Sequence, residues 1–225
     1  MLRAPVRPEI DHHIAKLVVG VIALSLPVLT NWFATSPLAS ISESYYQGGW
    51  SQSFLIGFLY AIAAFLLAYN GNSVPEMIAS KVAFVAALGV AMFPCRCGTH
   101  TEVVPNVHGA SAAVMFLTLA YFCYLFYQTA RAKRHRYQLA RARAVIYAAC
   151  GIAMLVFIGI LAFDALSGHA YSTGNALVFY GEAGALVAFG ISWLTASRTL
   201  PVITGKNERI PIRPGTPVPV EQKAA

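Results

Sequence analysis

The stretch AVIYAACGIAMLVFIGILAF, residues 144–163, has twenty residues and no charged side chain. A helix of this length is about 30 Å long, which matches the hydrocarbon core of a lipid bilayer. Of the 225 residues in the whole chain, 57% are hydrophobic and 11% are charged. A soluble domain has roughly 25% charged residues. The sequence therefore predicts an integral membrane protein.

Six apolar runs of this kind predict an all-α, polytopic membrane protein built as a six-transmembrane-helix bundle. The predicted spans are residues 14–34, 52–69, 77–94, 108–128, 144–163 and 175–196. A signal peptide is the alternative for the first run, but the run exceeds the usual apolar core of such peptides and ends in Trp32 and Phe33, which favours a retained helix. The predicted domains are a cytoplasmic segment (1–13), the transmembrane domain (14–196) and a proline-rich, disordered cytoplasmic tail (197–225).

Basic residues flank alternate loops and predict the orientation of the bundle. The loop after the fourth span and the tail are rich in Arg and Lys, whereas the loops at 35–51, 95–107 and 164–174 contain only Arg96. Because basic loops stay in the cytoplasm, both termini should be cytoplasmic in a multi-pass protein of the bacterial inner (plasma) membrane. The net charge of +7 is explained by anionic lipid, and nucleic acid is excluded as a partner. The predicted lipid headgroup contacts are Arg131, Lys133, Arg134, Arg136, Arg141 and Arg143.

The loop FPCRCGTHTEVVPNVHG, residues 93–109, joins two spans on the predicted outer side. In an oxidising compartment Cys95 and Cys97 can form a disulfide. Metal ligation is a second interpretation, because Cys95, Cys97, His100 and His108 offer ligands suited to a zinc or copper ion. Unpaired loop cysteines are a third. The sequence leaves the three interpretations open.

Glu182 lies inside the predicted sixth span, where a carboxylate costs about 3 kcal/mol unless it finds a partner. It predicts a polar pocket that opens outward, and its role there is that of a general base, a metal ligand, a proton relay or an interhelical hydrogen bond. The candidate pocket residues are Ser42, Glu43, Tyr45, Tyr46, His108, Asp164, His169 and Glu182. His108 and His169 are also the one pair placed to hold a haem, which we do not expect.

Four motifs carry a resemblance to a known family. They are SISESYY (40–46), ALGVAMFP (87–94), VHGASAAVMF (107–116) and EAGALVAFGISWL (182–194). In this order they resemble a family of uncharacterised bacterial six-span membrane proteins and, more distantly, the DRAM/FRAG/SFK group. The resemblance implies the fold, the topology and the positions that match the pattern, which are Ser40, Ser42, Tyr45, Tyr46, His108 and Glu182. It implies no reaction, and the Cys95–Cys97 loop departs from it.

These observations favour a binding or accessory (structural) membrane subunit with an outward-facing polar pocket, and they leave enzymatic activity open. The alternative is a metal-dependent membrane hydrolase with a zinc-type site at the outer face. Ser42, His108, Asp164 and His169 are similar in type to the site of alkaline ceramidases and progestin/adiponectin receptors, but those proteins have seven spans and a late His-x-x-x-His pair. A transporter and a haem-binding protein are less favoured. The expected partners are the lipid bilayer and either further copies of the chain or a larger membrane complex.

Overall fold

The computed structural model describes residues 12–97, 100–133, 139–167, 176–200 and 203–204. This part of the chain is helical and contains no strand. Its seven helices are α1 (His12–Trp32), α2 (Ser44–Gln47), α3 (Gly49–Ala68), α4 (Val74–Met92), α5 (Val107–Ala132), α6 (Ala140–Leu166) and α7 (Leu177–Ala196). All except α2 are long and apolar enough to cross a membrane. The predicted six-span bundle is confirmed, and the short helix α2 was not predicted.

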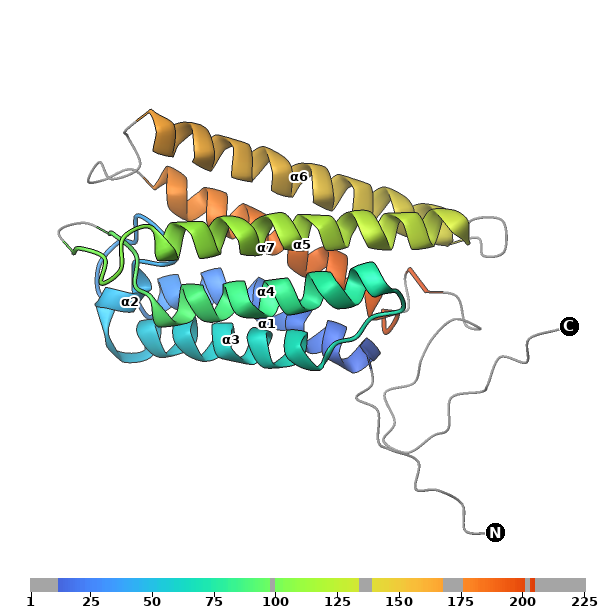
Figure 1. Cartoon of the computed structure of the whole chain (residues 1–225), viewed down its shortest axis with the longest axis horizontal. Helices are drawn as coiled ribbons and strands as arrows, with labels where there is room; N and C mark the ends of the chain where they lie inside the picture. The colour runs from blue at the N-terminus through green and yellow to red at the C-terminus, as the bar shows by residue number, and fades with distance from the viewer. Residues whose placement is uncertain (1–11, 98–99, 134–138, 168–175, 201–202, 205–225) are drawn as a thin grey trace, which may run out of the picture.

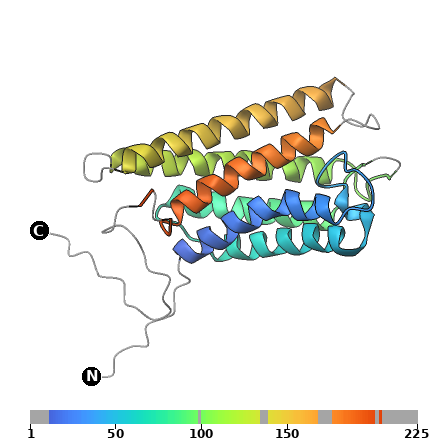
Figure 2. The ribbon, with the colours of Figure 1, turned by 180° about the vertical axis from the view of Figure 1, so that it is seen from behind.

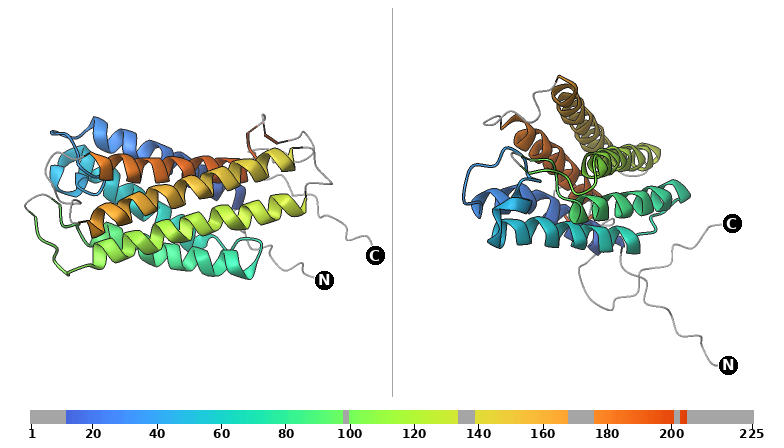
Figure 3. Two further views of the ribbon diagram at one scale, coloured as in Figure 1. Left: turned by 90° about the horizontal axis from the view of Figure 1, so that it is seen from above. Right: turned by 60° about the vertical axis from the view of Figure 1, so that its left-hand side comes forward.

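The six long helices run alternately up and down along one axis (Figure 1). Five of them form a ring in which α1 packs against α3 and α7, α4 packs against α3 and α5, and α5 reaches α7. The sixth, α6, packs against α5 and α7 on the outside of this ring, as the right-hand view in Figure 3 shows. From behind, α1 and α7 lie side by side (Figure 2). The protein is therefore a ring of five spans with one peripheral span.

The peripheral position of α6 agrees with its composition. It contains the stretch of residues 144–163, and it is both the most apolar and the least buried of the six spans. A helix that is apolar on all sides has no polar face to turn towards water, so lipid is its natural surrounding.

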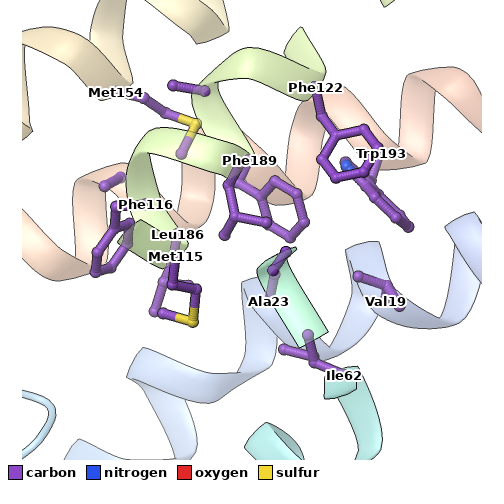
Figure 4. Close-up of a cluster of buried hydrophobic side chains, with 14 of the residues drawn as sticks. Val19, Ala23, Ile62, Met115, Phe116, Phe122, Met154, Leu186, Phe189 and Trp193 are labelled. Atoms are coloured by element: carbon purple, nitrogen blue, oxygen red, sulfur yellow. The ribbon is translucent and has the colours of Figure 1, made fainter. Parts of the chain in front are cut away.

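Aromatic and aliphatic side chains from all six spans meet along the axis of the bundle (Figure 4). Trp193 of α7 is fully buried and lies within 6.0 Å, centroid to centroid, of the rings of Phe122, Phe126 and Phe189. Close helix contacts surround this core. At Gly190 an added Cβ would lie 2.8 Å from Leu24 and 3.0 Å from the carbonyl oxygen of Gly20, so only glycine permits this approach of α1 and α7.

The two ends of the bundle differ in their loops. At the disulfide end, residues 33–48, 93–97 and 100–106 fold over the helices, and the second of these segments contains Cys95 and Cys97. At the opposite, basic end, α1 begins, α3 turns into α4, and α7 finishes.

Candidate functional site

Glu182 lies in the second turn of α7, roughly 8 Å along the helix from its first residue Leu177. Its carboxylate accepts a hydrogen bond of 2.6 Å from the backbone N–H of Ile41, and Ser42 lies within hydrogen-bonding reach of the same group. The first turn of α7 is tied to the same loop, because the N–H of Phe179 donates to the carbonyl of Ala39 over 2.9 Å. Glu182 is thus held by a backbone amide, with the predicted pocket residue Ser42 also within its reach.

His108 stands in the first turn of α5 and joins two other segments. Its Nδ1 lies 2.7 Å from the carbonyl oxygen of Phe93 at the end of α4, and its Nε2 lies 3.1 Å from Oγ of Ser42. A carbonyl only accepts, so Nδ1 carries the proton, and in the neutral imidazole Nε2 accepts from the Ser42 hydroxyl. Ser42 and His108 are each 8% exposed. The predicted residues Ser42, His108 and Glu182 therefore do come together, as one buried network.

Glu43 has a local role in the same loop. Its carboxylate accepts from the N–H of Ala39 over 2.6 Å, and its own N–H donates to Oγ of Ser40 over 3.0 Å. The hydroxyl of Ser44 donates to the carbonyl of Ile41 over 2.6 Å. These bonds satisfy backbone groups that neither a helix nor a sheet would satisfy. The loop before α2 is thereby held in one conformation.

Cys95 and Cys97 are joined by a disulfide. The hydroxyl of Tyr46 donates to the carbonyl of Cys95 over 2.9 Å, and its ring stacks on His100 with centroids 3.9 Å apart. Burial raises the pKa of the Tyr46 phenol, and so do the neighbouring Tyr45 and Glu102. The phenol therefore stays a hydrogen-bond donor at neutral pH. Tyr46 links the disulfide loop to α2.

The predicted metal site does not form from its four residues. The sulfur atoms of Cys95 and Cys97 are bonded to each other, His100 stacks on Tyr46, and both ring nitrogens of His108 have partners within the chain. Among the described residues, no three His, Cys, Asp or Glu side chains are grouped so that they could hold a metal ion. Cys95, Cys97 and His108 are thus already engaged in covalent or hydrogen bonds, and the ring of His100 lies flat against that of Tyr46.

A serine beside a histidine acceptor also resembles a nucleophile with its general base. Acyl transfer needs backbone N–H donors for the oxyanion as well. Here the N–H groups of Glu43, Ser44, Tyr45 and Tyr46 already donate to carbonyls within the loop, and that of Ile41 donates to Glu182. These five N–H groups are thus engaged within the chain, and the hydrogen bond between Ser42 and His108 ties the loop to α5.

A cavity of about 30 Å³ lies beneath Glu182 and Ser42. The other side chains around it are apolar, among them Leu59, Leu186 and Phe189, whereas Tyr45, Tyr46 and His108 do not line it. This cavity differs from the predicted polar pocket, because the polar groups of the loop are turned towards one another. A cavity of this size has room for one or two water molecules at most.

The remaining predicted residues fall elsewhere. Asp164 is buried near the end of α6, and its Oδ2 has no hydrogen-bond partner among the described residues. His169, Arg134 and Arg136 lie outside the described residues. Of the predicted lipid contacts, Arg131, Lys133 and Arg141 are exposed. Arg143 differs from the predicted lipid contact. It is 2% exposed and donates to the carbonyl of Ile203 over 3.0 Å, so its side chain is turned towards the protein.

A second polar cluster, at the basic end, was missed. Glu76 is buried in the first turn of α4 and accepts from the Tyr69 hydroxyl over 2.7 Å and from the N–H of Asn72 over 3.0 Å. The ammonium group of Lys16 lies 4.6 Å from the ring centroid of Phe126 and 5.2 Å from that of Tyr69. The sequence did carry a signal, because Lys16 and Glu76 are residues of opposite charge at the edges of predicted spans. A charged residue in such a place is easily interpreted as the boundary of a helix.

Comparison with protein-family models, with curated proteins and with solved structures found no match. The fold and the two polar clusters define the class of protein: an all-helical, multi-pass membrane protein with six spans.

Proposed function

We propose that this chain is a binding or accessory subunit of the bacterial inner membrane, of the six-span type that its motifs resemble. In this proposal the disulfide end faces the periplasm or exterior, and the basic end faces the cytoplasm, as the distribution of Arg and Lys favours. The partner is either a second copy of the chain or another membrane protein. The loops at the disulfide end form a fixed platform for this partner.

One observation carries the proposal: at the disulfide end the polar side chains of Ser42, Glu43, Tyr46, His108 and Glu182 are engaged in hydrogen bonds within the chain. Glu182, Ser42 and His108 hold the loop of residues 39–43 against α5 and α7. Tyr46 and the disulfide hold the neighbouring loop. Catalysis requires groups that are free to exchange protons or ligands, whereas a preorganised binding surface requires groups that are fixed. The arrangement supports the second role.

The test replaces Glu182 by two residues of different chemistry. Gln keeps an oxygen that accepts from Ile41, so Glu182→Gln should change the free energy of unfolding by less than about 1 kcal/mol. Leu leaves a buried N–H without a partner, so Glu182→Leu should lower it by about 1–3 kcal/mol and expose residues 39–43 to proteases. Unfolding in mixed micelles and limited proteolysis measure the two effects.

Tyr180→Leu is the matched control, because Tyr180 lies in the same part of α7 and is 68% exposed. It should leave both readouts unchanged. The size of the assembly extracted from the membrane is measured for all variants. If Glu182→Gln keeps full stability and yet abolishes assembly, the charge of the carboxylate has a function of its own, and a purely structural network is the wrong description.

A further inference from the structure

The Cys95–Cys97 disulfide joins two residues that stand two positions apart in the chain. A bridge this short connects no distant segments, so it adds little to the fold in the chain-entropy model. Hydrogen bonds hold the backbone on both sides of it as well. The Tyr46 hydroxyl donates to the carbonyl of Cys95 over 2.9 Å, and the N–H of His100 donates to the carbonyl of Cys97 over 3.0 Å. The two cysteines can therefore keep their positions when the bond between their sulfur atoms opens.

The two bridged cysteines differ in their access to solvent. Cys95 is 5% exposed, whereas Cys97 is half-buried. A thiolate that arrives from solvent therefore reaches Cys97 more readily than Cys95. In thiol–disulfide exchange the attacked sulfur enters a mixed disulfide, and the other sulfur leaves as a thiolate. The difference in exposure assigns the attacked position to Cys97 and the leaving position to Cys95.

A hydroxyl group lies beside the more exposed cysteine. Oγ of Ser40 is 3.7 Å from Sγ of Cys97, and Ser40 is buried. A sulfur atom in a disulfide carries no proton, so the hydroxyl is the donor in this contact. The same oxygen accepts from the N–H of Glu43 over 3.0 Å, which fixes its position. A donor fixed in this way stabilises negative charge on the sulfur when Cys97 becomes a thiolate.

We propose that Cys95 and Cys97 form a redox site that takes electrons from a dithiol of a partner protein. In the first step, a thiolate of the partner attacks Sγ of Cys97, a mixed disulfide forms, and Cys95 leaves as a thiolate. In the second step, the other thiolate of the partner attacks the partner's sulfur in the mixed disulfide, and Cys97 leaves as a thiolate beside Ser40. Two electrons pass to the two cysteines, which take up the two protons that the partner's thiols release. The partner is left with a disulfide.

This exchange requires no metal, general base or oxyanion donor, because the thiolate itself is the nucleophile. The hydrogen bonds that engage the neighbouring polar side chains therefore do not oppose it. The redox site goes beyond the proposed binding role, and the two proposals fail separately. Glu182→Leu tests the platform and leaves both sulfur atoms in place, whereas the redox site is tested through its thiols.

The first measurement is the equilibrium of the purified full chain, in an uncharged detergent, with mixtures of reduced and oxidised glutathione. Acid quenching, alkylation and mass spectrometry count the free thiols of Cys95 and Cys97. We expect the bond to be reduced with an equilibrium constant about a hundredfold or more above that of the structural disulfides of a secreted reference domain measured alongside. Equal resistance to reduction in the two proteins overturns the proposal, since the bond is then a structural one.

Two single-thiol variants test the roles of the two cysteines. Cys95→Ser leaves the thiol of Cys97, and Cys97→Ser leaves that of Cys95. With oxidised glutathione as the probe, Cys95→Ser should form the mixed disulfide about tenfold faster or more, because Cys97 is the more exposed residue and lies beside the Ser40 hydroxyl. Equal rates, or a faster reaction of Cys97→Ser, contradict the assignment of Cys97 as the attacked residue.

Ser40→Ala, introduced into the Cys95→Ser variant, tests the hydroxyl donor. Loss of the donor should slow mixed-disulfide formation by about threefold, because the smaller fraction of thiolate outweighs the higher reactivity of each thiolate. A loop that had only loosened would expose Cys97 and react faster. Ser36→Ala is the matched control and should leave the rate unchanged, because Ser36 is an exposed serine of the same loop that accepts from Gln47. If Ser40→Ala reacts as fast as Ser36→Ala or faster, Ser40 has no part in the exchange.

Discussion

The two ends of the bundle hold buried polar clusters that are built in opposite ways. At the disulfide end, the carboxylate of Glu182 meets a backbone amide, and His108 lies between a carbonyl and a hydroxyl. At the basic end, Glu76 and Lys16 are buried beside the cations of a cavity. The first cluster has satisfied its hydrogen bonds internally. The second is built around buried charge, because Glu76 is the electrostatic partner of Lys16 and also accepts from Tyr69 and Asn72.

The comparison teaches that a buried polar residue in a membrane protein is not by itself a functional site. Burial makes an unsatisfied polar group costly, so most such groups are satisfied by neighbours and contribute to structure. What separates the two ends is the kind of interaction: hydrogen bonds to backbone and hydroxyl groups at the disulfide end, and a buried pair of opposite charges at the basic end.

The largest effect is expected from Glu76→Ala. This change removes the countercharge of Lys16 and leaves the Tyr69 hydroxyl and the Asn72 N–H without their acceptor. Breaking a buried charge pair by removal of one partner typically costs about 3–5 kcal/mol. Unfolding in mixed micelles should therefore show a greater loss for Glu76→Ala than for Glu182→Leu.

A second change distinguishes charge from packing at this position. When Lys16→Met is combined with Glu76→Ala, no uncompensated ammonium is left, and part of the stability should return. Two outcomes would contradict this: Glu76→Ala costs no more stability than Glu182→Leu, or Lys16→Met adds to the loss. Either would show that the charge pair of Lys16 and Glu76 does not stabilise the basic end. The contrast between the ends would then be wrong.

Reduction of the Cys95–Cys97 disulfide is expected to have an intermediate effect. A loop of three residues loses little chain entropy when it is closed, so opening it should cost about 1.5 kcal/mol in the chain-entropy model. After reduction, a membrane-impermeant maleimide should label the protein on intact cells if the disulfide end faces outward. Mass spectrometry of the labelled peptide measures both the bond and its side of the membrane.

Cys123 and Cys150 serve as internal controls, because both are buried inside spans and should stay unlabelled. A Cys95→Ser, Cys97→Ser double variant should lose the label completely. Labelling of the untreated wild type would show free thiols in place of the disulfide. Labelling only after the cells are opened would reverse the proposed orientation.

The six spans could be predicted because a span is recognised by the length and apolarity of one segment. Neither property depends on which helices pack against that segment. The six spans are confirmed with boundaries that differ by four residues or fewer. The peripheral place of α6 was not predicted, although its apolarity on all sides was a usable signal. Packing order depends on contacts between helices, and those contacts are carried by small residues such as Gly20 and Gly190 that occur in most spans.

The polar residues were predictable as a set but not in their pairing. The cost of burying Glu182 signals that it has a partner, and the structure brings it together with Ser42 and His108. Its principal partner is the N–H of Ile41, and a backbone amide leaves no mark in the sequence. Glu76 was missed because it lies one residue outside the predicted span, where a charge looks ordinary.

The smallest effect is expected from Tyr46→Phe, which removes one hydroxyl and keeps the ring that stacks on His100. The lost bond to the Cys95 carbonyl should cost about 1 kcal/mol at neutral pH. Because the pKa of Tyr46 is raised in the folded protein, its contribution is complete below the usual phenol pKa of about 10 and is lost as the pH rises through the folded value. Thermal unfolding at neutral and alkaline pH measures this difference.

Tyr45→Phe is the matched control, because the described residues give the Tyr45 hydroxyl no hydrogen bond and the two rings pack together. Equal losses in the two variants would show that the disulfide loop does not depend on the Tyr46 hydroxyl. The hydrogen bond from Tyr46 to the Cys95 carbonyl would then contribute nothing to the stability of the disulfide end.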